Sequence, residues 1–226
     1  MNELQNEYRD TYAKAVIIGN GPSAIKISEN EPNTLYIGIN QGLNLIDHPT
    51  LLALNDYENI LTILPEKLNK IRYIVSPYYP HIKGKVNKNI TWENIEREIK
   101  NKIENYQNYS SLKLTNKKID NKIEKGTVQW FLHNLWTSTI KHEQYPSLGH
   151  SFTTTDTLIE YLPLLFKNLK KINCYGICKK NGYNESVKKI HRETVNDTRY
   201  PPDYQQKLIK KMTTSLKKYG ITINFN

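Results

Sequence analysis

Short apolar runs rich in β-branched residues alternate along the chain with helical stretches, and this alternation most constrains the fold. The runs predict strands at Ala13–Gly19, Thr34–Asn40, Leu51–Asn55, Ile71–Ser76, Lys171–Ile177 and Ile221–Phe225. Helical patterns lie between or beside them, at 57–70, 91–99, 155–169 and 203–218. Strands that alternate with helices form βαβ units, whose strands run parallel. The expected fold is therefore α/β, with a Rossmann-like, mostly parallel sheet that carries helices on both faces.

A polar region interrupts this pattern in the middle of the chain. Residues 83–147 are expected to form a helical and polar insertion, or lid, within one domain that spans residues 1–226. The stretch after the helix at 91–99 is polar and weakly periodic up to residue 126, so we expect it to lie outside the sheet. Val128–Ile140 is strongly apolar and predicts a helix packed onto the core. The charged residues of the helix at 91–99, including Glu98, and the nearby Lys102 are expected to face solvent.

Several classes of protein are excluded or disfavoured by composition. A chain of 226 residues can bury a sizeable core. It contains no run of 18 apolar residues and no apolar signal core at its start, which predicts a cytoplasmic protein with at most a peripheral contact to a membrane. Two cysteines, Cys174 and Cys178, make neither a disulfide framework nor a zinc site, and both are expected to be buried strand residues.

The positive charge is concentrated in the last quarter of the chain. Residues 167–226 contain 14 Lys or Arg and 4 Asp or Glu, whereas the rest of the chain contains 18 of each sign. A surface of this kind is suited to the phosphates of a nucleotide or a nucleic acid. A solvated helix face in a lysine-rich chain accounts for the same excess, so the charge by itself leaves both interpretations open.

Polar residues follow the predicted strands, where an open parallel sheet binds its ligands. These residues are Asn20, Ser23, Asn40, Gln41, Asn55 and Asp56. Short amides offer both donors and acceptors to a ribose or a base, and glycines such as Gly19 and Gly21 let main-chain amides approach a phosphate. The first turn also fits G-x-G-x-x-A, but Asn40–Gln41 stands where a dinucleotide-binding fold has its ribose-binding carboxylate.

Short motifs distributed over most of the predicted core carry a more particular resemblance. They are GNGPS after the first strand, Asn-Gln after the second, Asn after the third, Pro146-Ser147-Leu148-Gly149, and Tyr175-Gly176 followed by His191. In these motifs the chain resembles bacterial sialyltransferases of the lipooligosaccharide type, and the late motifs are similar to those of animal sialyltransferases. The opening pattern is also similar to that of domains related to hydroxymethylpterin diphosphokinase. Residues 83–145 have no counterpart in either resemblance.

The resemblance to sialyltransferases implies a role for individual residues. Asn20, Ser23, Asn40, Gln41 and Asn55, with the glycines of the first turn, would hold a cytidine nucleotide, and Thr155 and Asp156 would meet the donor. Tyr183 would bind the leaving phosphate, with Lys179, Lys180 and Arg192 nearby to neutralise its charge. His191 would be the general base, since the ordinary pKa of an imidazole lies near neutrality. His150, in Gly149-His150-Ser151, is the alternative base.

The expected function is that of a glycosyltransferase. It would move a sugar, sialic acid or a related acid sugar, from a CMP-sugar to a hydroxyl of a glycan or glycolipid, without a metal, a further cofactor or a specific nucleic-acid partner. A second interpretation is a Mg²⁺-dependent phosphotransferase of the pterin type, in which Asp56 or Asp156 would become metal ligands. A third is a non-catalytic nucleic-acid-binding module that uses the basic last quarter of the chain.

Overall fold

The computed structural model describes residues 11–54, 57–77, 81–82, 85–86, 89, 92–102, 110–113, 130–134, 154–177, 184 and 202–226. The strands of its main sheet are β1 (Lys14–Ile18), β2 (Thr34–Ile39), β3 (Leu51–Ala53), β4 (Tyr73–Pro77), β7 (Ser110–Lys113), β8 (Trp130–Asn134), β9 (Lys171–Tyr175) and β10 (Thr222–Phe225). Two short strands, β5 (His81–Ile82) and β6 (Lys85–Val86), form a separate pair. The helices are η1 (Asn40–Leu45), α2 (Tyr57–Thr62), α3 (Pro65–Leu68), α4 (Trp92–Lys102), α5 (Thr154–Leu165) and α7 (Pro202–Lys217). None of the described helices has the length and apolar character needed to cross a bilayer.

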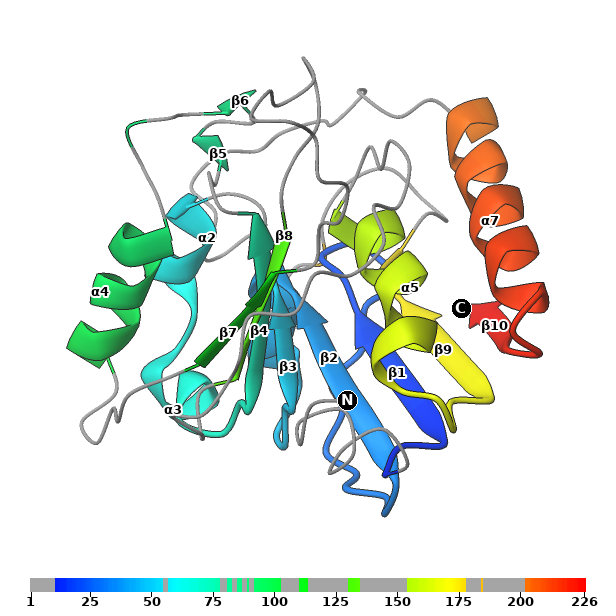
Figure 1. The fold of residues 1–226 in the computed structure, drawn as a ribbon, viewed down its shortest axis with the longest axis horizontal. Helices are drawn as coiled ribbons and strands as arrows, with labels where there is room; N and C mark the ends of the chain where they lie inside the picture. Colours follow the sequence, from blue (N-terminus) through cyan, green and yellow to red (C-terminus); the bar gives the residue numbers. More distant parts are fainter. Residues whose placement is uncertain are drawn as a thin grey trace.

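The sheet confirms the predicted α/β fold with a mostly parallel sheet (Figure 1). Its strand order is β10-β9-β1-β2-β3-β4-β8-β7, and every neighbouring pair from β10 to β4 is parallel. The chain leaves β1 towards β2 but returns on the other side of β1 at β9. The strand order therefore reverses between β1 and β9, and in open α/β sheets a crevice at such a reversal is where ligands bind.

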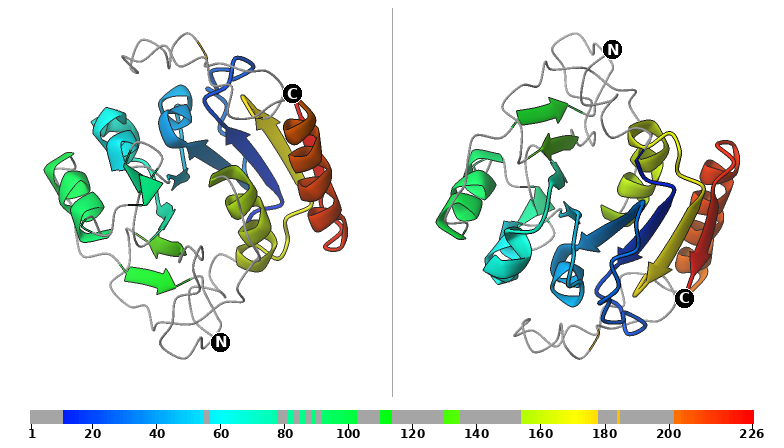
Figure 2. Two further views of the ribbon diagram at one scale, coloured as in Figure 1. Left: turned by 90° about the horizontal axis from the view of Figure 1, so that it is seen from above. Right: turned by 90° about the horizontal axis from the view of Figure 1, so that it is seen from below.

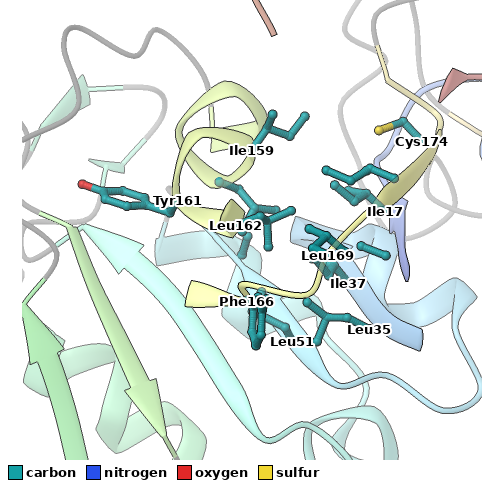
Figure 3. Packing of buried hydrophobic residues seen from close by; sticks show 14 of the residues in the cluster. Ile17, Leu35, Ile37, Leu51, Ile159, Tyr161, Leu162, Phe166, Leu169 and Cys174 are labelled. Carbon is teal, nitrogen blue, oxygen red and sulfur yellow. The ribbon is translucent and has the colours of Figure 1, made fainter. Parts of the chain in front are cut away.

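One face of the sheet packs against α5 and α7. Successive side chains of a strand point to opposite faces, and on this face Ile17, Ile37 and Leu51 are completely buried. They belong to one apolar cluster with Leu162 and Phe166, from α5 and the turn that follows it (Figure 3). The same cluster contains Cys174, which confirms its predicted burial in a strand; Cys178 lies outside the described residues.

The opposite face packs against the remaining helices (Figure 2). Leu52 and Ile74 point to this side, where they meet Ile60 of α2 and Leu68 of α3. Ile95 of α4 belongs to the same cluster and is also completely buried. Helices thus cover both faces, as the alternation of strands and helices predicts.

The helical pattern at 57–70 forms two short helices, α2 and α3, instead of one. The proline ring of Pro65 disfavours helical backbone at the preceding residue. Leu64 is accordingly extended, with φ −68° and ψ 134°, and Pro65 begins α3 in the position that proline prefers. Ile60 and Leu68 still pack on the same face of the sheet, so the apolar spacing reports the burial correctly although the helix is broken.

Two expectations for the middle of the chain are wrong. The polar stretch after α4 was expected to lie outside the sheet, but β7 is a strand of the main sheet. The predicted helix at Val128–Ile140 contains β8, which pairs antiparallel with β4 through Val75↔Leu132. β4 would otherwise present an unpaired row of main-chain groups, and the aromatic and apolar residues at 130–132 suit a strand as well as a helix. A lid formed by residues 83–147 stays a prediction.

The sequence predicts that the charged residues at the end of α4 face solvent, but in the structure they attach this helix to α2. The ammonium group of Lys102 donates hydrogen bonds to the main-chain oxygens of Ile60, Leu61 and Ile63, at 2.7, 2.8 and 3.0 Å. These carbonyls lie at the end of α2, where a helix lacks its own donors. Burial lowers the pKa of Lys102. Glu98 accepts a hydrogen bond of 2.8 Å from the hydroxyl of Tyr57.

Asp47 joins three segments on the same side of the sheet. Its carboxylate accepts hydrogen bonds from Ser28 and from Lys67 of α3, both at 2.9 Å, and pairs with Lys26 at 3.3 Å. The main-chain oxygen of Asp47 also accepts a bond from Lys70 at 2.8 Å. The hydrogen bonds from Lys67, Ser28 and Lys26 hold the pKa of Asp47 well below its usual range.

Asp47→Asn is therefore expected to lower stability in a pH-dependent way. Because the pKa of Asp47 is depressed in the folded state, its stabilisation is complete above about pH 4 and is lost as the pH falls towards the folded-state value. The difference in free energy of unfolding between the original protein and Asp47→Asn should be constant from pH 7 to 5 and should shrink below pH 4. Urea denaturation at a series of pH values measures it.

Glu31→Gln is the matched control for Asp47→Asn. Glu31 pairs with Lys14 at 2.9 Å, but both side chains are 55% exposed, and such pairs contribute little. A difference for Asp47→Asn that stays unchanged down to pH 2 would contradict the assignment of Asp47 as the titrating anchor.

Candidate functional site

The predicted site residues that the structure describes gather at one edge of the sheet. They follow β1, follow β2 or begin α5: Gly19, Asn20, Gly21, Ser23, Asn40, Gln41, Thr155 and Asp156. α5 precedes β9, which is parallel to β1, and its first turn lies at the edge where the parallel strands end (Figure 1). This is also the edge at which the strand order reverses.

Gly19 and Gly21 are required by a close approach of two main-chain segments. The amide of Gly19 donates to the oxygen of Tyr175 at 2.8 Å, and the amide of Gly21 donates to the oxygen of Gly176 at 2.9 Å. A Cβ atom on Gly19 or Gly21 would lie 2.5 or 2.7 Å from the Gly176 oxygen. Both amides therefore already have partners in the end of β9, so a phosphate-binding role for these glycines cannot rest on their N–H groups.

The hydroxyl of Ser23 is also used within the fold. It accepts a hydrogen bond of 3.1 Å from the amide of Gly176 and donates one of 2.8 Å to the main-chain oxygen of Asn226. Ser23 thus ties the turn after β1 to the ends of β9 and β10. Its predicted contact with a nucleotide stays a prediction, while its contacts within the fold are sufficient to explain its position.

A chain of side-chain hydrogen bonds runs from the end of β1 to α2. Asn20 donates through Nδ2 to Oε1 of Gln41 at 2.7 Å. Gln41, which is completely buried, donates through Nε2 to Oδ1 of Asn59 at 2.6 Å and to the hydroxyl oxygen of Thr62 at 2.9 Å. The nitrogen and the oxygen of the Gln41 amide therefore both have partners within the fold, and Gln41 acts by positioning Asn20.

The direction of these hydrogen bonds is fixed from the α2 end. The hydroxyl of Thr62 donates its hydrogen to the main-chain oxygen of Asn59 at 3.0 Å, so it can only accept from Gln41. Gln41 must then turn its nitrogen to α2 and its oxygen to Asn20. Asn20 therefore donates through Nδ2 to Gln41, and its Oδ1 takes no part in this contact. This oxygen is buried and accepts no hydrogen bond from the residues that the structure describes.

Asn40 offers a second oxygen of the same kind. Its Oδ1 is buried and has no hydrogen-bond donor among the described residues, and its backbone has φ +53°, a left-handed conformation that asparagine tolerates better than most residues. Asn40 is also the first residue of η1, whereas the sequence predicts the end of a strand there. Two adjacent parallel strands, β1 and β2, are thus each followed by an asparagine with an unused, acceptor-only oxygen.

The chain returns to this edge at Asn184. The main-chain amide of Asn184 donates to the main-chain oxygen of Asn20 at 2.8 Å, and its Nδ2 donates to the oxygen of Ala24 at 2.7 Å. Asn184 stands within the basic stretch that supplies the predicted phosphate-binding residues. At this residue, that stretch is attached to the turn that carries Asn20.

The other predicted site residues lie outside the described part of the chain. They are Asn55, Tyr183, Lys179, Lys180, His191, Arg192 and the alternative base His150. Their roles stay predictions. Among the residues that the structure describes, no three His, Cys, Asp or Glu side chains are grouped as metal ligands.

Four further residues, Asn59, Thr62, Gly176 and Asn184, hold this edge together although the sequence predicts no site role for them. For Asn59 and Thr62 the sequence does contain a signal, because each immediately precedes a buried isoleucine, Ile60 in α2 and Ile63 just after it. Polar groups at such positions must find partners inside the fold. For Asn184 the sequence contains no comparable signal.

Comparison of the chain with models of protein families, with curated proteins and with solved structures finds no match.

Gly19→Ala is expected to lower the free energy of unfolding by about 1–3 kcal/mol, the usual cost of overpacking, because its Cβ meets a main-chain oxygen. Gly220→Ala is the control: Gly220 has φ +69° with no atom within 4 Å of an added Cβ, so only backbone strain of about 1 kcal/mol is added. Urea denaturation compares the two. If Gly19→Ala loses no more free energy of unfolding than Gly220→Ala, the end of β9 moves away easily and the expectation is wrong.

Proposed function

We propose that the protein is a metal-independent glycosyltransferase that binds a CMP-sugar at the edge where β1 and β2 end. The sugar, sialic acid or a related acid sugar, is transferred to a hydroxyl group of a glycan or glycolipid. The observation that carries the proposal is the pair of unused amide oxygens on Asn20 and Asn40. Both belong to motifs in which the chain resembles sialyltransferases.

The chemistry of these two oxygens favours a nucleotide as the ligand. An amide oxygen only accepts hydrogen bonds, so the ligand must supply donors. The ribose hydroxyls and the exocyclic amino group of CMP are such donors. A buried acceptor without a partner costs about 1–3 kcal/mol, so a ligand that satisfies both oxygens gains affinity from them.

The transfer step follows from the residues assigned by the resemblance. His191 removes the proton from the acceptor hydroxyl, and the resulting oxygen nucleophile attacks the anomeric carbon of the donor sugar. The bond between that carbon and the phosphate oxygen breaks, and CMP leaves with the electron pair. Tyr183, Lys179, Lys180 and Arg192 stabilise the charge of the departing phosphate.

Asn40→Gly tests the binding part of the proposal. Glycine keeps the left-handed backbone and removes only the side chain that offers Oδ1. We expect isothermal titration calorimetry in EDTA to show CMP binding to the original protein, in preference to UDP and ADP. Affinity for CMP should be about tenfold lower in Asn40→Gly, which corresponds to about 1.4 kcal/mol for the lost hydrogen bond.

Asn33→Gly is the matched control for Asn40→Gly. Asn33 is the other described non-glycine residue with positive φ, +57°, but it is exposed and precedes β2, at the opposite end of that strand. The two substitutions change the backbone in the same way, so only loss of Oδ1 at the candidate site separates them. Absence of CMP binding to the original protein, or equal affinities in the two variants, would contradict the proposal.

His191→Ala tests the chemistry. It is expected to lower the rate of sugar transfer by about 10²–10⁴-fold, the usual contribution of a general base, while affinity for CMP is unchanged. Transfer should persist in EDTA. The comparison variant is His150→Ala: if that variant loses transfer and His191→Ala retains it, the assignment of the base is wrong. Activity that requires a divalent metal would favour the phosphotransferase of the pterin type instead.

A further inference from the structure

The outward side of α7 is a row of lysines. The helix buries Leu208, Met212 and Leu216, which follow one another at intervals of four residues in the cluster with α5. The side chains exposed on the rest of the helix and just after it are Gln206, Lys207, Lys210, Thr213, Thr214, Lys217 and Lys218. Figure 1 shows α7 at the outer edge of the fold, beside β10. We call Lys207, Lys210, Lys217 and Lys218 the lysine row.

The charges of the lysine row are not neutralised by the surrounding described residues. No Asp or Glu follows Asp203 in the chain. The lysine of α7 that does form an ion pair is Lys211, with Glu160 of α5 at 3.2 Å. The four members of the row have no acidic partner in the part of the chain that the structure describes. An uncompensated row of this kind attracts a polyanion.

Three further exposed lysines lie near the C-terminal end of α7. These are Lys167, Lys170 and Lys171, in the turn before β9 and at the start of that strand. Thr222, just after α7, donates through its amide to the oxygen of Lys170 at 2.9 Å and lies opposite Lys171 in the sheet. The basic surface therefore continues from the lysine row to the turn before β9 and the first residue of that strand.

An aromatic side chain stands at the end of the lysine row. Tyr219 is 40% exposed, and the ammonium group of Lys218 lies 5.2 Å from the centre of its ring. Exposed aromatic rings next to lysines are the arrangement on which bases of single-stranded nucleic acids stack while the cations contact the phosphates. From Lys207 to Lys217 the helix rises by about 15 Å, a length that accommodates several successive phosphates.

A membrane is a less suitable partner for this surface. A helix that lies on a bilayer turns its apolar side to the lipid. Leu208, Met212 and Leu216 of α7 are instead buried in the core, and the other exposed large apolar residues of the described chain, Ile25, Leu61 and Leu64, lie on different elements. Threonine and glutamine, which are exposed between the lysines, are common contacts of phosphate and sugar.

We infer that the lysine row and Tyr219 form a binding surface for single-stranded nucleic acid, without sequence preference. This inference does not depend on the proposed transferase activity, because it concerns a different surface. Phosphate contacts by lysine release counterions, so affinity must fall steeply with salt, with a slope of about −0.7 per phosphate contacted on a single strand.

The test is the fluorescence anisotropy of a labelled 15-nucleotide single strand of mixed sequence, titrated with the full chain at several salt concentrations. The triple variant Lys207→Gln, Lys210→Gln and Lys217→Gln should bind at least tenfold more weakly at low salt. It should also have a salt slope that is smaller in magnitude by about 2. Tyr219→Leu should weaken binding about equally at every salt concentration and leave the slope unchanged.

The control is Lys26→Gln, Lys70→Gln and Lys100→Gln, which removes the same charge from other surfaces of the protein. Its slope and affinity should match those of the original protein, and urea denaturation confirms that each variant is folded. Failure of the original protein to bind the strand at low salt would overturn the inference. Equal slopes in the two triple variants would also overturn it, as would binding only to vesicles that contain phosphatidylserine.

Discussion

The carboxyl end of β1 is crossed closely by two other main-chain segments, and the candidate site depends on this crossing. On one side, the turn after β1 lies against the end of β9, where the Gly176 oxygen leaves no room for a side chain at Gly19 or Gly21. On the other side, a Cβ on Gly42 of η1 would overlap the oxygen of Ile18. Because both neighbours are held by main-chain contacts, the turn has little freedom. Asn20 and Gln41 are therefore brought together by the backbone before their side chains interact.

The protein uses its two kinds of polar group in different places. Neutral amides, of which Asn20 and Asn40 each have an oxygen without a donor among the described residues, occupy the edge of the sheet between η1, β1 and α2. Charged groups instead attach the outer helices, as Asp47 does for α3 and Lys102 does for α2 and α4. The lysines that have no acidic partner among the described residues lie farther out, on α7. The two proposed binding surfaces thus differ in chemistry: one selects for hydrogen-bond donors and the other for charge.

The sequence was sufficient for the parallel core, because short runs rich in β-branched residues alternate with helical patterns, as βαβ units require. It failed for β8, where the same apolar residues suit either a helix or a strand and only the open side of β4 decides. It failed for β7 because a polar edge strand has no apolar period. Neither the direction of the hydrogen bonds at Gln41 nor the attachment of Asn184 could be predicted, since both arise from contacts between segments distant in the chain.

The orientation of Gln41 has a consequence for how this site can change over time. The atom that Asn20 presents is decided two hydrogen bonds away, by the groups of α2 that bind Gln41, namely the accepting hydroxyl of Thr62 and Oδ1 of Asn59. An amide can turn over by half a rotation with almost no change in volume. A replacement at Thr62 that only donates, together with a turned amide at Asn59, would reverse Gln41 and then Asn20, so that a nitrogen faced outward. A substitution at a position remote from the ligand could thus change the ligand preference while every residue that contacts the ligand stays the same.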